Sequence, residues 1–180
     1  MTIPPSLEQE DQQLAHDAHR RSAAPMPIVM VAHDISTPEN IGSLFRIADA
    51  FGLAHLYLSG ESAMPPNTKI RRVARATEQH VPWSHEEPLT LLARLKAEGY
   101  TCVCLEITRH SIDIADYRVP EGAKLCLVVG AEKHGVPDAI LAECETALHI
   151  PMRGTNSSMN VATACAVAAY VLSQQLLAIN

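Results

Sequence analysis

Short apolar runs alternate with amphipathic stretches along most of the chain. Ile28–Ala32 and Lys124–Val129 are nearly continuous apolar runs, a pattern typical of strands that are covered on both faces. Between Ser36 and about Phe51 the apolar positions recur at helical spacing instead, with Pro38 suited to the first turn and Gly52 to the stop. The chain therefore begins its ordered part with a buried strand followed by a helix.

The same alternation continues to the C-terminus. We expect four further strands, at His55–Leu58, Val81–Trp83, Tyr100–Ile107 and Thr146–Ile150. We expect three further helices, at Leu89–Ala97, at about Pro137–Ala142 and in the last twenty residues. Because strand and helix alternate throughout, the pattern predicts an α/β fold with a mostly parallel sheet and flanking helices.

The last of these helices follows a strand end at Ile150–Pro151 and a loop of small residues, Gly154–Ser157. It contains no charged side chain, yet it is too weakly hydrophobic to be taken as a membrane span, so we expect a helix buried in its own domain or against a partner. Ser158 and Asn160 lie at its entrance, where free backbone N–H groups carry a partial positive charge. N-capping by a serine is the alternative explanation for these polar residues.

Composition indicates a single globular domain. The chain has 180 residues, of which 47% are hydrophobic and 19% charged. Its five cysteines are odd in number and form no C-x-x-C pair, so they predict reduced core thiols. With no recognisable leader, a cytoplasmic protein is expected.

The polar composition of residues 1–25 predicts a mobile extension, and residues 26–180 are expected to form the folded domain. His16 and His19 could share a helix face, but nothing nearby completes a metal site.

Charge is unevenly distributed. The net charge of −6 argues against a protein that coats nucleic acid indiscriminately, but it permits a local basic patch. One segment is densely basic. Its four cations are Lys69, Arg71, Arg72 and Arg75. Any contact with nucleic acid is therefore expected to be local.

The segment Gly130–Gly135 follows directly on an apolar strand, and open α/β sheets bind ligands at the carboxyl ends of their strands. The pattern is G-x-E-x-x-G. It is neither a dinucleotide-binding fingerprint nor a P-loop, and no G-x-S-x-G elbow occurs elsewhere. Taken alone, the pattern is better explained by a structural turn.

Three short motifs in a fixed order are more specific. They are Asn40-x-Gly42-x-x-x-Arg46-x-Ala48, then Gly130-x-Glu132-x-x-Gly135, then Ile150-Pro151-Met152 followed by Ser158-Met159-Asn160-Val161. Together they closely resemble the three motifs of the SpoU (TrmH-like) branch of the SPOUT RNA methyltransferases, over about residues 28–178. Met159 departs from the family's usual leucine, and Ala162-Thr163 replaces a pair that usually contains serine. The long terminal helices with which some members grip tRNA are not evident.

The resemblance implies transfer of a methyl group from S-adenosylmethionine to a ribose 2′-hydroxyl of tRNA or rRNA. It also implies the SPOUT fold with a deep C-terminal trefoil knot, a homodimer whose active site draws on both chains, and no metal, membrane or DNA partner. The matching catalytic positions are Asn40, Arg46, Glu132, Ser158 and Asn160. The matching cofactor positions are Glu106, Gly130, Gly135, Ile150, Met152, Ser158 and Met159. Arg46 and the basic cluster would contact RNA.

Arg46 raises a chemical question, because a guanidinium is effectively always protonated in proteins and is a costly general base. We favour a clamp on the adjacent phosphate that also stabilises the developing alkoxide, while arginine as the base stays open. Two rival functions remain. One is a noncatalytic S-adenosylmethionine- or RNA-binding module, which would not need all five catalytic positions. The other is methylation of a base nitrogen, which would not call for the pair Asn40 and Arg46.

Overall fold

The computed structural model describes residues 24–179. Most of the predicted mobile extension, with His16 and His19, lies outside these residues. Within them, a seven-stranded sheet runs in the order β3-β2-β1-β6-β4-β7-β5, and every strand pairing is parallel. The strands are β1 (Met26–His33), β2 (Leu53–Ser59), β3 (Trp83–His85), β4 (Tyr100–Leu105), β5 (Ile112–Asp113), β6 (Lys124–Val129) and β7 (Thr146–His149).

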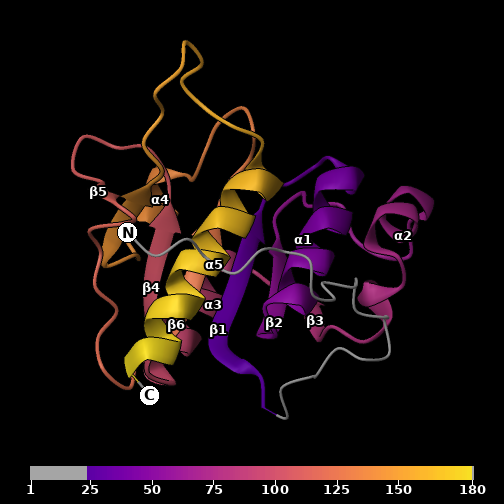
Figure 1. The fold of residues 1–180 in the computed structure, drawn as a ribbon. Coiled ribbons are helices and arrows are strands. Elements are labelled where there is room, and N and C mark those ends of the chain that lie inside the picture. The colour runs from indigo at the N-terminus through magenta and orange to yellow at the C-terminus, as the bar shows by residue number, and fades with distance from the viewer. Residues whose placement is uncertain (1–23, 180) are drawn as a thin grey trace, which may run out of the picture.

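Helices cover both faces of the sheet (Figure 1). Helices α1, α2 and α5 pack on one face, and α3 and α4 pack on the other. Their bounds are α1 (Pro38–Ala50), α2 (Thr68–Ala74), α3 (Pro88–Ala97), α4 (Asp138–Leu141) and α5 (Val161–Ile179), with a short 3-10 turn at Thr77–Gln79. The predicted α/β class with a parallel sheet and flanking helices is confirmed.

The core follows the two-residue period of the central strands. In β1, Ile28 and Met30 face α1 and α5, whereas Val29 and Val31 face α3. Both sets are almost completely buried. Residues 28–32 are continuously apolar in the sequence because a strand covered on both faces has no face that contacts water.

One predicted strand was misplaced, and two elements were not anticipated. The third strand begins at Trp83, where it was expected to end, and α2 and β5 were not predicted. Helix α2 has seven residues, so its apolar positions, Ile70, Val73 and Ala74, form only one repeat at helical spacing among basic residues. The side chain of Asn67 begins the helix by accepting hydrogen bonds from the N–H groups of Lys69 and Ile70. Strand β5 has only two residues.

Helix α5 is long and apolar enough to cross a membrane by length and composition alone, a test that the core helix of a soluble protein also passes. Here the helix lies along the sheet with Cys165, Ala168 and Leu172 fully buried against it. The predicted helix buried in its own domain is therefore present in the structure. Its outer face keeps Tyr170 and Leu177 more than half exposed.

Candidate active site

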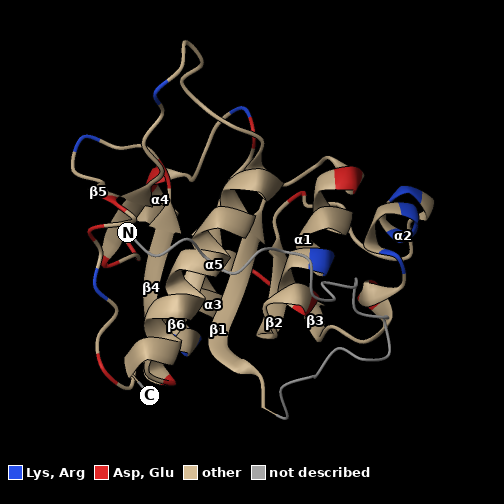
Figure 2. Cartoon of the chain, viewed as in Figure 1, with Lys and Arg blue, Asp and Glu red and all other residues tan. Residues whose placement is uncertain are grey.

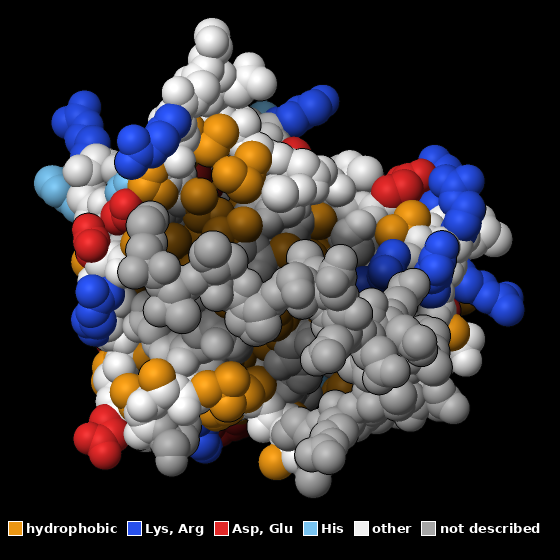
Figure 3. Space-filling view, viewed as in Figure 1, with side chains coloured by type: hydrophobic (Ala, Val, Ile, Leu, Met, Phe, Trp, Pro, Cys, Tyr) orange, Lys and Arg blue, Asp and Glu red, His pale blue; other side chains and the backbone are white. Residues whose placement is uncertain are grey.

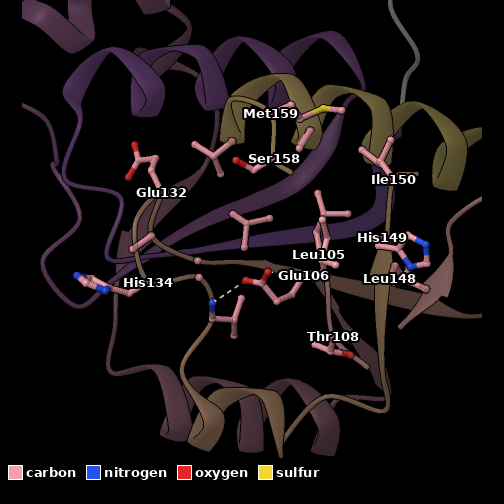
Figure 4. Close-up of a pocket in the computed structure, with 18 of the residues that line it drawn as sticks. Leu105, Glu106, Thr108, Glu132, His134, Leu148, His149, Ile150, Ser158 and Met159 are labelled. Carbon is pink, nitrogen blue, oxygen red and sulfur yellow. Dashed lines mark hydrogen bonds between the residues drawn. The ribbon is translucent and has the colours of Figure 1, made fainter. Parts of the chain in front are cut away.

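A cavity of about 960 Å³ opens at the carboxyl ends of three neighbouring strands, β6, β4 and β7. The loops that follow these strands form its walls, and the start of α5 closes one side (Figure 4). Because these strands are parallel and adjacent in the sheet, their following loops gather at one edge. This gathering brings together residues that are up to about sixty positions apart in the sequence.

The loop between β6 and α4 is folded tightly on itself. The N–H of Gly135 donates to the carbonyl oxygen of Ala131 at 2.9 Å. A Cβ atom on Gly130 would lie 2.2 Å from the carbonyl oxygen of Gly135, and Gly135 itself has φ of +66°. Both glycines of the G-x-E-x-x-G motif are thus required by the geometry of the loop, Gly130 by close approach and Gly135 by its left-handed backbone.

Glu106 ties this loop to the end of β4. Its Oε2 atom accepts a hydrogen bond from the N–H of Val136 at 3.0 Å, the contact drawn as a dashed line in Figure 4, and its Oε1 atom accepts one from the N–H of Ile107 at 2.9 Å. A Cβ atom on Gly135 would lie 2.3 Å from Glu106 Oε2. The carboxylate therefore joins two walls of the cavity, and the missing side chain of Gly135 makes that contact possible.

Three of the five predicted catalytic residues form one hydrogen-bonded chain. Asn40 donates through Nδ2 to Glu132 Oε1 at 2.5 Å, and its Oδ1 accepts from Asn160 Nδ2 at 3.0 Å. Asn160 Oδ1 in turn accepts from the N–H groups of Ala162 and Thr163 at 3.0 and 3.2 Å. The start of α1, the glycine loop and the start of α5 are thus joined at the cavity.

These bonds also correct the expectation about the start of α5. The capping residue is Asn160, whereas the alternative proposed from the sequence was a serine. Ser158 lines the cavity instead and forms no side-chain hydrogen bond with another residue of 24–179. Its hydroxyl is consequently available to a ligand.

Arg46 does not join this group. It is exposed on α1 and is not among the residues that line the cavity. Six residues separate it from Asn40, which corresponds to about 9 Å along the helix axis and about 120° around it. An ion pair with Asp49, three residues further along α1, would be the alternative explanation for Arg46. No such pair occurs within residues 24–179, where Asp49 pairs with His80 at 3.0 Å.

All the predicted cofactor positions line this one cavity (Figure 4). They are Glu106, Gly130, Gly135, Ile150, Met152, Ser158 and Met159. The sequence interpretation missed His149, which also lines the cavity and whose Nδ1 atom is buried without a hydrogen-bond partner among residues 24–179. The sequence offered one sign of this residue, because His149 is a polar residue at the end of a mainly apolar strand, directly before Ile150–Pro151.

The basic cluster is Lys69, Arg71, Arg72 and Arg75, all exposed. It lies on α2 and at that helix's end, where basic side chains gather at one edge of the molecule (Figures 2 and 3). Glu39 at the start of α1 is 3.8 Å from the Lys69 ammonium and 3.7 Å from the Arg72 guanidinium. Gly42 brings the two helices together, since a Cβ atom there would lie 2.8 Å from the Ile70 carbonyl oxygen.

The thiols match the prediction of reduced cysteines. All five are free, and Cys102, Cys104, Cys126 and Cys165 are buried. Burial raises the pKa of Cys165, under α5, to about 12. This thiol is therefore protonated at neutral pH. No group of three or more His, Cys, Asp or Glu residues suited to a metal ion occurs within residues 24–179.

The fold and the cavity define an α/β protein whose pocket lies at the carboxyl ends of its central parallel strands, which is where open α/β sheets bind ligands. At the edge of this pocket Glu132, Asn40 and Asn160 form a hydrogen-bonded chain. The particular family is shown by comparison with known proteins. The sequence model of the SpoU rRNA Methylase family matches residues 27–170, and the chain belongs to that family.

Individual relatives agree with this assignment. The chain is 32% identical over 153 residues to the mouse (Mus musculus) protein TARBP1, named a tRNA (guanosine(18)-2′-O)-methyltransferase; the match covers 83% of this chain and 10% of that protein. It is 30% identical over 164 residues to RlmP of Bacillus subtilis, named a 23S rRNA (guanosine(2553)-2′-O)-methyltransferase, covering 89% of this chain and 64% of that one. The chain thus spans less than two thirds of the length of either relative.

A solved structure shows the same fold. The SpoU methyltransferase AviRb from Streptomyces viridochromogenes, in complex with the cofactor AdoMet, superposes with a TM-score of 0.76 at 24% identity. The match covers 83% of this chain and 60% of that one. At this identity the likeness concerns the fold.

Proposed function

We propose that the protein transfers a methyl group from S-adenosylmethionine to a ribose 2′-hydroxyl of tRNA or rRNA. The observation that carries the proposal is the hydrogen-bonded chain of Glu132, Asn40 and Asn160 at the edge of the cavity. Membership of the SpoU family and the names of the two relatives support the same reaction.

The cavity fits S-adenosylmethionine on two grounds. Its glycine loop offers backbone N–H and carbonyl groups, and Gly130 and Gly135 have no side chain that could cover them. A Cβ atom at either position would clash with the loop itself or with Glu106. The buried Nδ1 atom of His149 lacks a partner among the described residues and needs a polar group from a ligand. The cofactor supplies a methyl group already activated on a sulfonium.

The remaining tasks are to align the ribose oxygen and to handle one proton. Asn40, held from both sides by Glu132 and Asn160, is a preorganised polar group for the RNA, and Ser158 has a free hydroxyl for the ribose. Arg46 clamps the neighbouring phosphate and stabilises the developing alkoxide. The other reading, in which Arg46 is the general base, requires a neutral guanidinium.

Arg46 lies apart from the cavity of its own chain, so we propose a homodimer in which Arg46 completes the site of the partner subunit. The exposed Tyr170 and Leu177 on α5 provide an apolar face for such contact. The further proposals are a deep trefoil knot formed from about Gly130 to α5, a folded domain at 26–180, a cytoplasmic location and no DNA substrate. The free thiols support the location.

A noncatalytic binding module is the second candidate. It would bind S-adenosylmethionine or RNA without needing Asn40, Glu132 and Asn160 fixed against one another, so the bonded set favours an enzyme.

The decisive experiment incubates the purified protein with labelled S-adenosylmethionine and with tRNA and rRNA from a strain that lacks the gene. We expect label in RNA as a nuclease-resistant 2′-O-methylated dinucleotide. Binding of S-adenosylhomocysteine without any transfer to either RNA would favour the noncatalytic module, and transfer to a base would exclude ribose methylation.

A further inference from the structure

A second cavity, of about 460 Å³, lies beside α2 and shares no lining residue with the candidate active site. Pro65, Pro66 and the indole of Trp83 form part of its wall. Trp83 is braced from behind, because its ring meets that of Phe45 edge-on at 6.1 Å. The cavity therefore offers a rigid, mainly flat-sided surface to a planar ligand.

Two polar groups in this cavity lack partners. The Oε2 atom of Glu78 is buried and has no hydrogen-bond partner within residues 24–179. Arg71 lines the same cavity, yet forms no ion pair with Glu78 or with any other described residue. A buried carboxylate oxygen without a donor is costly, so the Glu78 carboxylate gains free energy by turning toward a ligand that brings its own donors.

The surroundings indicate what kind of ligand reaches the cavity. The side chains of Lys69 and Arg72, on the same helix as Arg71, are 62% and 74% exposed, so this helix presents two further cations to solvent. Clustered exposed cations attract a polyanion, and proteins that bind single-stranded nucleic acid combine such charge with aromatic side chains on which unpaired bases stack.

We propose that this second cavity binds an unstacked guanine of the RNA, at a nucleotide other than the one that is methylated. The inference rests on the proposed RNA substrate. Trp83 stacks on the base, and Glu78 accepts from its N1–H and N2–H groups, two adjacent donors that only guanine has on that edge. Arg71 donates to the neighbouring O6. Uracil presents one donor between two carbonyl oxygens, which a carboxylate repels.

The fluorescence of Trp83 can report binding at this cavity, because Trp83 is the single tryptophan of the chain. The test titrates tryptophan fluorescence of the whole protein with a five-nucleotide RNA that has one central guanosine, and with the same RNA carrying uridine throughout. We expect the guanosine RNA to quench Trp83 and to bind about tenfold more tightly, the scale of one bidentate base contact. Equal quenching by both RNAs, or none by either, would overturn the inference.

Glu78→Gln keeps the shape of the side chain and removes the charge, and it should reduce the tenfold preference to about twofold. The matched control is Glu121→Gln, which makes the same change at an exposed carboxylate that lines neither cavity, and which should keep the preference. A preference that survives Glu78→Gln would contradict the assignment; if that variant fails to fold, the comparison of the two RNAs with the unaltered protein still decides.

The proposed methyl transfer and the proposed guanine site can be refuted independently of each other. Loss of guanine preference in a protein that still binds S-adenosylhomocysteine and methylates RNA refutes only the second cavity as a base site. Absence of methyl transfer by the unaltered protein, with guanine-dependent quenching intact, refutes only the proposed reaction.

Discussion

At the scale of single residues, the site depends as much on side chains that are missing as on those that are present. Gly130 and Gly135 let the loop close on itself, and Gly135 lets Glu106 reach the N–H of Val136. Gly42 does the same between α1 and α2. Each glycine marks a close approach of backbone, which explains why the motif contains glycine at these positions rather than another small residue.

Gly130→Ala should therefore be costly. Its new methyl group would lie 2.2 Å from a backbone oxygen that cannot move aside, so we expect a loss of about 1–3 kcal/mol in the free energy of unfolding and loss of S-adenosylhomocysteine binding. Thermal melts and calorimetry measure both. Gly154→Ala is the control, because a Cβ atom there meets nothing within 4 Å, and its effect should stay within about 0.5 kcal/mol.

Substitutions of Arg46 distinguish a catalytic role of this residue from a role in RNA binding alone. Arg46→Ala should leave affinity for S-adenosylhomocysteine unchanged and lower the methylation rate by roughly a hundredfold or more, the scale of losing one transition-state donor. Arg46→Lys keeps the charge but not the planar fork, so it should restore little. A single-turnover rate that survives Arg46→Ala, with only RNA affinity lost, would make this residue one more phosphate contact.

At the scale of elements, α1 connects the candidate active site to the basic cluster. Its first turn holds Asn40 against the active-site set and, through Glu39, contacts the basic side chains of α2. Glu39 partly neutralises the cluster to which RNA phosphates would bind. Surface pairs at 3.7–3.8 Å contribute little to stability, so this carboxylate affects the RNA surface more than the fold.

Charge changes on these two helices should therefore act on RNA affinity alone. Lys69→Ala with Arg72→Ala should weaken RNA binding and flatten its salt dependence by about one unit per lost phosphate contact, while the rate at saturating RNA survives. Glu39→Gln should strengthen RNA binding a few-fold. Filter binding across salt concentrations measures each, and Lys96→Ala is the control, since Lys96 pairs with Glu143 on the other face of the sheet. An unchanged slope would remove the cluster from the RNA interface.

At the scale of the whole molecule, one chain holds four of the five catalytic candidates at its cavity and Arg46 elsewhere. Asn40 and Asn160 are bonded there, Glu132 and Ser158 line the wall, and Arg46 is two turns along α1 on another side of the helix. A dimer resolves this separation if each subunit contributes Arg46 to the other's cavity.

Mixed dimers test this arrangement directly. Arg46→Ala and Asn160→Ala should each be inactive alone, but co-expressed they should regain about a quarter of wild-type activity, because half of randomly paired dimers are mixed and each has one intact site. Sedimentation should show a dimer at micromolar concentration. A monomer with full activity, or no recovery on mixing, would rule out a shared site.

Much of the architecture followed from the sequence, because it depends on local patterns. The apolar runs predicted the central strands, and Lys124–Val129 matches β6 at both ends. The period of the segment after Pro38 predicted α1 with its buried Ile41, Leu44 and Phe45. The motif glycines and Asn160 were identified as site residues through the resemblance to the SpoU motifs, and Asn160 also through its place at the entrance of the last helix. Such features depend on neighbours in the chain, which is what a sequence displays.

The tertiary structure decided what depends on distant neighbours. Helix α2 shows only one apolar repeat in the sequence, and it is stabilised by the Asn67 cap and by packing on α1 at Gly42. The unpartnered atoms of His149 and Glu78, and the separation of Arg46 from Asn160, depend on which strands lie side by side and how their loops close. The sequence indicated most residues of the site but missed His149, whereas their partners were decided by the sheet order, which joins residues 120 positions apart such as Asn40 and Asn160.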